Sequence, residues 1–178
     1  MHARQSATPQ LVLAALMTAL TAVCAQVQIP LPAVPLSLAT LGACLCGALL
    51  PPRFAALAMA AYVLLGAIGV PVYAGFAAGP SVLFGPTGGY LLGYIPLAVT
   101  VSLILRRTER SFPALALAMA AGTAICYALG TAWFMAVTGT GLSAAVVSCV
   151  LPFLPGDGAK IALAATLAMR LNKAIHTS

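Results

Sequence analysis

LPFLPGDGAK, residues 151–160, contains Asp157, one of only two acidic residues in the chain, and a lysine three positions later, Lys160. Long apolar runs surround this stretch, and a charged side chain that faces membrane hydrocarbon costs about 2.5–3.5 kcal/mol even on lenient scales. An Asp–Lys pair inside a membrane is therefore a candidate functional site. The rest of the chain is expected to form the helices and loops that surround it.

The composition indicates an integral membrane protein. The chain has 178 residues, of which 62% are hydrophobic and 6% are charged, whereas soluble domains carry roughly 25% charged residues. Because a spanning helix needs about 20 apolar residues, the length allows six spans with short connections. We expect an all-α bundle of six transmembrane helices that forms one domain, residues 1–178.

The apolar runs and the breaks between them place the six spans. The expected spans are about 10–27, 36–50, 53–69, 87–105, 113–137 and 157–171. Three prolines make residues 28–35 an extended connection, and Pro51 and Pro52 end the second span, because proline lacks a backbone donor and disfavours helix before it. The connection at 70–86 is long, uncharged and rich in Gly, Pro and aromatic residues, as binding loops often are. Residues 138–156 have room for a further short apolar segment.

The basic residues indicate the orientation of the bundle. Seven of the eight fall on one side of the six-span map, and they are Arg4, Arg53, Arg106, Arg107, Arg110, Arg170 and Lys173. The positive-inside rule then places both termini in the cytoplasm. This topology explains the net charge of +6 better than a nucleic-acid partner does. Lys160 is the one basic residue that topology leaves unexplained.

Asp157 and Lys160 lie three residues apart, hence on one face of a helix. One interpretation is structural: Asp157 caps the sixth span after Pro155-Gly156, and Lys160 neutralises it or extends outward. The functional interpretation is favoured, because an uncharged cap would serve without introducing a lysine. A ligand with amide-like N–H groups would donate to Asp157, and an oxygen acceptor or carboxylate would bind Lys160.

A second stretch, GPTGGYLLGY at residues 85–94, opens the fourth span on the same side of the membrane. Its glycines permit close approach, and its helix start offers free backbone N–H groups to a polar ligand. Glycine and proline also simply end helices, so a structural role is an equal alternative. Tyr73, Phe76, Phe84 and Tyr90 are candidates for an aromatic wall above the site, with interfacial packing as the alternative. No nucleophile–base pair, metal cluster or phosphate loop can be assembled, so we expect neither an enzyme nor a cofactor.

The first span carries Ala15 and Ala19 four residues apart, with Thr18 and Ala22 near the same side. Small residues at this spacing let membrane helices approach closely. Two interpretations remain open for this face, because an alanine-rich chain produces such a pattern easily by chance. The face packs inside the bundle, or it is a docking surface for another subunit.

With these residues in place, the chain resembles the BioY-type proteins, the biotin-binding substrate-specificity (S) components of energy-coupling-factor (ECF) vitamin transporters. The matching stretches are IPLPAVPLSLATL at 29–41, the run from 70 to 94 that includes GPTGGYLLGY, and LPFLPGDGAK at 151–160. Together with the six-span layout, the likeness covers nearly the whole chain.

The resemblance implies a bundle that captures biotin from outside and is powered by a coupling transmembrane protein and two ATPase subunits. It assigns the polar anchors for biotin to Asp157 and Lys160. It places the backbone of Thr87, Gly88 and Gly89, together with Tyr90, around the pocket, and it places Tyr73 and Gly75 in the loop above. The docking face would be Ala15 and Ala19. No arginine is available on the outer side, so the biotin carboxylate would use Lys160, backbone or hydroxyl donors, or stay near water.

Two other functions stay open. The same architecture could serve another small vitamin, or the chain could be an autonomous facilitator that moves its substrate without ATP. The sparse charge argues against an ion channel, because pores usually line their path with polar or charged rings. Besides lipid and the ECF module, self-association into a homo-oligomer is a further possible partnership.

Overall fold

Six main helices make up the structure. A computed structural model describes residues 7–30 and 34–176, so Arg4 and the side chain of Lys173 lie outside the description. The helices are α1 (Ala7–Gln26), α2 (Ala39–Leu49), α3 (Pro52–Ala67), α5 (Gly88–Leu105), α6 (Phe112–Thr138) and α8 (Leu154–His176). They match the six predicted spans, which confirms the all-α bundle.

Short elements fill three of the connections. Between α1 and α2, β1 (Gln28–Ile29) pairs antiparallel with β2 (Leu36–Ser37). The proline-rich connection predicted at 28–35 is thus extended at its start, while its residues 31–33 lie outside the described residues. The long connection after α3 holds a 3-10 turn, η1 (Ala74–Phe76), and one helical turn, α4 (Pro80–Leu83). The apolar segment expected before the last span is α7 (Leu142–Cys149).

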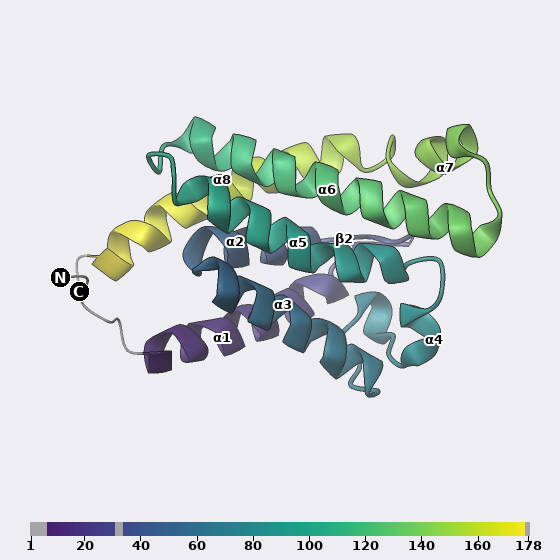
Figure 1. Cartoon of the computed structure of the whole chain (residues 1–178), viewed down its shortest axis with the longest axis horizontal. Coiled ribbons are helices and arrows are strands. Elements are labelled where there is room, and N and C mark those ends of the chain that lie inside the picture. The colour runs from purple at the N-terminus through teal and green to yellow at the C-terminus, as the bar shows by residue number, and fades with distance from the viewer. Residues whose placement is uncertain (1–6, 31–33, 177–178) are drawn as a thin grey trace.

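The helices form three layers (Figure 1). α6 and α8 lie along one side, α1 and α3 along the other, and α2 and α5 lie between them. The central position of α2 follows from its sequence, ATLGACLCGAL, whose small side chains let neighbouring helices come close. At Gly47, for example, a Cβ atom would stand 2.5 Å from the carbonyl oxygen of Ala98 on α5. All of α2 from Leu41 to Ala48 is buried.

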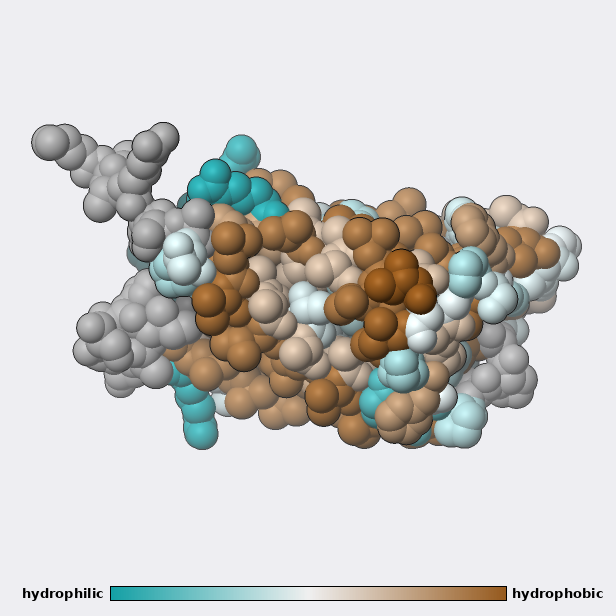
Figure 2. Space-filling model, turned by 90° about the horizontal axis from the view of Figure 1, so that it is seen from below, coloured by the Kyte–Doolittle hydropathy of each residue, from teal (hydrophilic) through white to brown (hydrophobic). Residues whose placement is uncertain are grey.

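The surface of the bundle is that of a membrane protein. Among the described residues, α1, α5 and α6 are each long and apolar enough to cross a membrane. α7 and α8, bent by 49° at their junction, qualify together as a fourth span, whereas α2 and α3 are apolar but shorter. Figure 2 shows hydrophobic side chains over most of the middle of one side and hydrophilic ones toward its ends. Exposed apolar residues on α1 and α3 include Leu11, Leu16, Val23, Leu57 and Leu64.

Chain reversals gather at the two ends of the bundle. The start of α1, the end of α8 and the α5–α6 turn lie at one end (Figure 1). The β1–β2 hairpin, α4 and the α6–α7 turn lie toward the other. The second end is where loops and helix starts meet around the Asp157–Lys160 pair.

Candidate functional site

The two charges of the LPFLPGDGAK stretch form an ion pair inside the bundle. Lys160 Nζ lies 2.6 Å from Asp157 Oδ1, and the residues are 8% and 4% exposed. Helix α8 begins at Leu154, earlier than predicted, and the backbone N–H of Asp157 already donates to the carbonyl of Phe153 at 2.8 Å. Asp157 therefore lies within the first turns of the helix, and the interpretation of this residue as its N-terminal cap is wrong.

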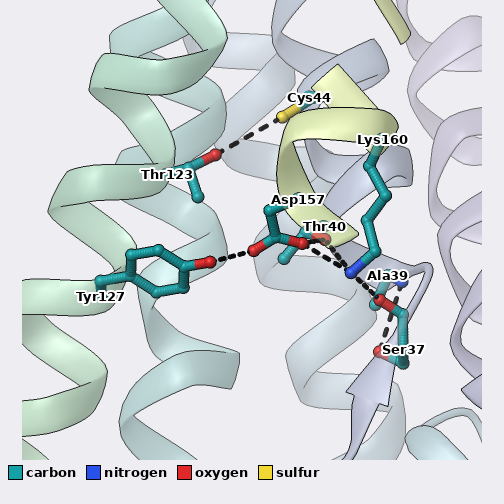
Figure 3. A network of polar contacts seen from close by, with 8 residues as sticks. All are labelled: Ser37, Ala39, Thr40, Cys44, Thr123, Tyr127, Asp157 and Lys160. Carbon is teal, nitrogen blue, oxygen red and sulfur yellow. Dashed lines mark hydrogen bonds and ion pairs between the residues drawn. The ribbon is translucent and has the colours of Figure 1, made fainter. Parts of the chain in front are cut away.

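Side chains from α2 and α6 complete the network around the pair (Figure 3). Thr40 on α2 donates to Asp157 Oδ1 at 3.4 Å, and Tyr127 on α6 donates to Asp157 Oδ2. Lys160 Nζ donates to the Ser37 carbonyl at 2.7 Å and to Thr40 Oγ1 at 3.3 Å. Each N–H of the ammonium thus has an acceptor, and both carboxylate oxygens have a donor.

This arrangement explains how the membrane interior tolerates two charges. Removing an ion from water is costly in a low dielectric, and the cost is offset only where the partner charge and further hydrogen bonds are in place. The pair carries no net charge, yet it presents a carboxylate and an ammonium side by side. Such a pair is suited to a ligand group that offers N–H donors next to an oxygen acceptor.

Two adjacent cavities lie against the network. The smaller, about 30 Å³, borders the ion pair together with Thr40, Thr123 and Tyr127. The larger, about 180 Å³, extends toward the loop after α3 and is lined by Tyr73, Ala74, Ala77, Val82, Thr87 and Leu91. Both cavities share Val34, Pro35, Ser37, Tyr90 and Tyr94 as walls. The site thus has a polar end at the ion pair and a wider, largely apolar end under the loop.

Four of the predicted binding residues besides the ion pair lie at or beside these cavities. Tyr90 lines both, and its hydroxyl lies 3.0 Å from Thr131 Oγ1, which ties α5 to α6. Tyr73 and Thr87 line the larger one. The hydroxyl of Tyr73 donates to the Val63 carbonyl at 2.6 Å, and burial raises the pKa of Tyr73, so the group stays a neutral donor. Gly75 follows Tyr73 and packs against Gln28.

Gly88 and Gly89 are placed differently from the prediction. A side chain at Gly89 would collide with Trp133 on α6, and one at Gly88 would collide with the Leu83 carbonyl. The small size of Gly89 therefore permits close packing between α5 and α6, and that of Gly88 permits the tight turn before α5. Neither glycine lines the two cavities. Trp133 completes this joint, because its Nε1 donates to the Gly85 carbonyl at 3.0 Å.

Two other aromatic residues do not join the proposed wall. Phe76 and Phe84 are 70% and 69% exposed, so only Tyr73 and Tyr90 of that set face the cavities.

On α1, Ala15 and Ala19 are exposed, whereas Ala14, Met17 and Thr18 face the bundle. Thr18 Oγ1 donates to the Ala58 carbonyl of α3 at 2.9 Å, so the face of α1 that carries Thr18 points into the bundle. Ala15 and Ala19 lie on the neighbouring, exposed face. The alternative that Ala15 and Ala19 pack inside the bundle is wrong, and Thr18 is not part of the exposed face.

Sequence reasoning missed Ser37, Thr40, Thr123 and Tyr127, which come from two helices and a strand far from Asp157 in the chain. A usable signal existed for Tyr127, because a tyrosine within an apolar span usually has a hydrogen-bond partner.

Among the described residues, no group of three His, Cys, Asp or Glu side chains is close enough to hold a metal ion.

A helical membrane bundle with an internal cavity beside one fully bonded ion pair defines a membrane protein that binds a small solute within its own helices. The BioY family model matches residues 1–177. The chain thus belongs to the BioY family, a family of transporters rather than enzymes, and it is a multi-pass protein of the cytoplasmic membrane.

Similar proteins agree with this assignment over most of their length. The chain is 40% identical to the biotin transporter BioY of Thermotoga maritima, over 92% of this chain and 96% of that protein. It is 38% identical to the biotin transporter BioY of Rhodobacter capsulatus, over 76% and 77% of the two chains. Its fold matches the crystal structure of the S-component for biotin from an ECF-type ABC transporter, with a TM-score of 0.88, 25% identity, and coverage of 97% and 95%.

Proposed function

We propose that this chain is the membrane subunit that binds biotin and takes part in its uptake. The observation that carries the proposal is the Asp157–Lys160 pair at the polar end of the cavity. The ureido ring of biotin has two N–H donors on either side of one carbonyl. It matches a carboxylate and an ammonium placed side by side, without adding charge to a buried neutral pair.

The bonding of the pair supports one orientation of the ligand. Asp157 already matches the single positive charge of Lys160, and a ligand carboxylate beside it would add a second negative charge to a low-dielectric site. The smaller cavity is only large enough for a polar group or a few waters. The ureido edge is therefore proposed to enter it, while the apolar body and the valerate chain occupy the larger cavity.

Equilibrium binding to purified protein in detergent tests both parts. Biotin should bind tightly, whereas riboflavin and thiamine, at the same concentrations, should not. The methyl ester of biotin should keep most of the affinity, because the carboxylate lies away from the ion pair. If well-folded protein does not bind biotin, the assigned substrate is wrong. A loss of affinity with the ester comparable to that of an ion-pair variant would reverse the orientation.

The energy source is proposed to be an ECF module, a coupling transmembrane protein with ATPase subunits. The structural neighbour is described as a component of such a transporter, and Ala15 and Ala19 lie exposed on α1 where a partner helix can approach closely. Uptake measured with and without the coupling proteins decides between this module and an autonomous facilitator. The homo-oligomer remains a further possibility, which the mass of the purified protein in detergent tests.

Both termini are proposed to lie in the cytoplasm. The start of α1 and the end of α8 lie at one end of the bundle (Figure 1), together with the α5–α6 turn that carries Arg106, Arg107 and Arg110. An excess of Arg and Lys marks the cytoplasmic side of membrane proteins. The cavity would then open toward the outside of the cell.

A further inference from the structure

One side chain at the end of α1 holds the loop above the larger cavity. The amide of Gln26 donates from Nε2 to the carbonyls of Val72 at 3.3 Å and Tyr73 at 3.2 Å. Its Oε1 accepts from the backbone N–H of Phe76 at 2.8 Å. A third contact of Nε2, to the Ala22 carbonyl at 3.0 Å, fixes the side chain to its own helix. A single glutamine therefore bonds both sides of the turn at residues 72–76.

This turn needs such support, because two consecutive residues have left-handed backbone conformations. Gly75 has a φ of 71° and Phe76 a φ of 58°. Phenylalanine adopts this region only under constraint from its surroundings. The Phe76 side chain supplies little of that constraint, because it is 70% exposed. The backbone bond from Phe76 to Gln26 is thus a main support of the strained conformation.

The turn forms part of the cavity wall. Tyr73, Ala74 and Ala77 line the larger cavity, and the Tyr73 hydroxyl is anchored to Val63 on α3. The turn is thus fastened to α3 through the Tyr73 ring and to α1 through Gln26. The same segment is also bonded to α3 through the N–H of Gly79, which donates to the Gly66 carbonyl at 2.7 Å. Without the attachment to α1, the turn can pivot about its attachments to α3 and open the cavity toward the end of the bundle.

We propose that Gln26 is a positioning residue that keeps the 72–76 turn closed over the ligand, and that it thereby sets how fast the ligand leaves. The inference rests on the proposed function, since it assigns the closing element of the same cavity. Gln26 lies outside both sets of cavity-lining residues, so its effect is transmitted through the backbone of the turn.

Two variants separate the bonds of Gln26 from its volume. Gln26→Met keeps the length of the side chain and removes every bond to the turn. Because each such bond contributes modestly and the two N–H groups of Nε2 are shared among three carbonyls, their loss should speed biotin dissociation roughly 10-fold, with little change in the association rate. Hydrogen exchange of the peptide that covers residues 72–79 should also become faster in ligand-free protein. Val23→Met, at an exposed position of α1, is the matched control and should change neither rate.

Gln26→Glu supplies a readout that a purely structural role would not produce. When protonated, its carboxyl group can still donate to one carbonyl of the turn, but when ionised it repels the carbonyls of Val72 and Tyr73. Biotin dissociation from this variant should therefore become faster as the pH rises from about 3.5 to 6, across the ordinary glutamate pKa of about 4.3. The wild type and Gln26→Met should show no such pH dependence.

Different results overturn the two proposals. If biotin does not bind the wild type, the proposed function fails, whereas the exchange of residues 72–79 still tests the role of Gln26 in ligand-free protein. Unchanged exchange in Gln26→Met, or unchanged dissociation from a variant that binds, overturns the positioning role. A smaller fraction of competent protein with normal dissociation would also overturn it, because that pattern indicates a folding defect alone.

Discussion

The Asp157–Lys160 pair can be tested for a role in binding that is separate from its role in folding. Both residues are buried, and their charged atoms lie 2.6 Å apart. Removal of one partner of such a pair leaves an unpaired buried charge, at a cost of about 3–5 kcal/mol. For a domain of this size, 1 kcal/mol corresponds to roughly 2–4 °C. Asp157→Asn or Lys160→Met alone should therefore lower the melting temperature by about 6–20 °C.

The double variant Asp157→Asn/Lys160→Met gives the decisive comparison. It removes both charges together, so no unpaired charge remains, and most of the lost thermal stability should return. Biotin affinity should not return, because the ligand loses both charged partners. A loss of at least 2 kcal/mol per truncated partner corresponds to roughly 30-fold or more in the dissociation constant. Thermal unfolding and equilibrium binding, both in the same detergent, measure the two effects.

Thr166→Val is the matched control on α8, since Thr166 is exposed and its hydroxyl donates to the Ala162 carbonyl of its own helix. It should change neither stability nor affinity appreciably. A double variant that folds and binds biotin like the wild type would show that the pair is structural. A double variant as unstable as the single ones would show that the two charges do not depend on each other.

Three further predictions concern packing, docking and topology. Gly89→Ala should destabilise the protein by about 1–3 kcal/mol, because the new Cβ atom would collide with Trp133. Thermal unfolding measures this loss, and an unchanged melting temperature would contradict the close packing of α5 on α6. Ala15→Trp or Ala19→Trp should abolish uptake that depends on the coupling proteins while sparing biotin binding in detergent, and a loss of binding would instead indicate damage to the bundle. A reporter protein that is active only in the cytoplasm should be active when it is fused to the C-terminus. A reporter that is active only in the periplasm should be inactive at the same position.

The sequence predicts the helices well because their signals are local. Apolar runs of spanning length and the breaks at Pro51-Pro52 and at the proline-rich segment place all six main helices within a few residues. The start of α8 is the miss that matters for the site, because it changes the position of Asp157 in the helix. Pro155 and Gly156 indicate a helix that begins after them, but proline is readily accommodated in a first turn, so the helix extends back to Leu154.

The site is harder to predict than the helices, because its members meet only after folding. Asp157 and Lys160 are visible in the sequence as charges in an apolar chain. Thr40 and Tyr127 are ordinary residues, and they lie 117 and 30 positions away from Asp157. Their role depends on the placement of α2 and α6 beside α8, which no local pattern encodes. The same limit explains why the role of Gly88 and Gly89 was predicted wrongly. A glycine indicates that some other group comes close to the backbone, but it does not show whether that group is a ligand or a neighbouring helix.

The exposed basic residues and the buried Asp157–Lys160 pair have different roles in this chain. The described arginines, namely Arg53, Arg106, Arg107, Arg110 and Arg170, are exposed, which suits residues that orient the protein at a membrane surface. Lys160 is buried and matched by Asp157, so the interior of the site is polar but neutral. A neutral ring with donors and an acceptor can exchange hydrogen bonds with this pair, whereas a charged group there would add a third charge where water cannot screen it. Under the proposed function, the buried, neutral ion pair would therefore select the charge of the ligand's head group, and the biotin carboxylate would lie at the opposite end of the cavity, under the turn that Gln26 holds.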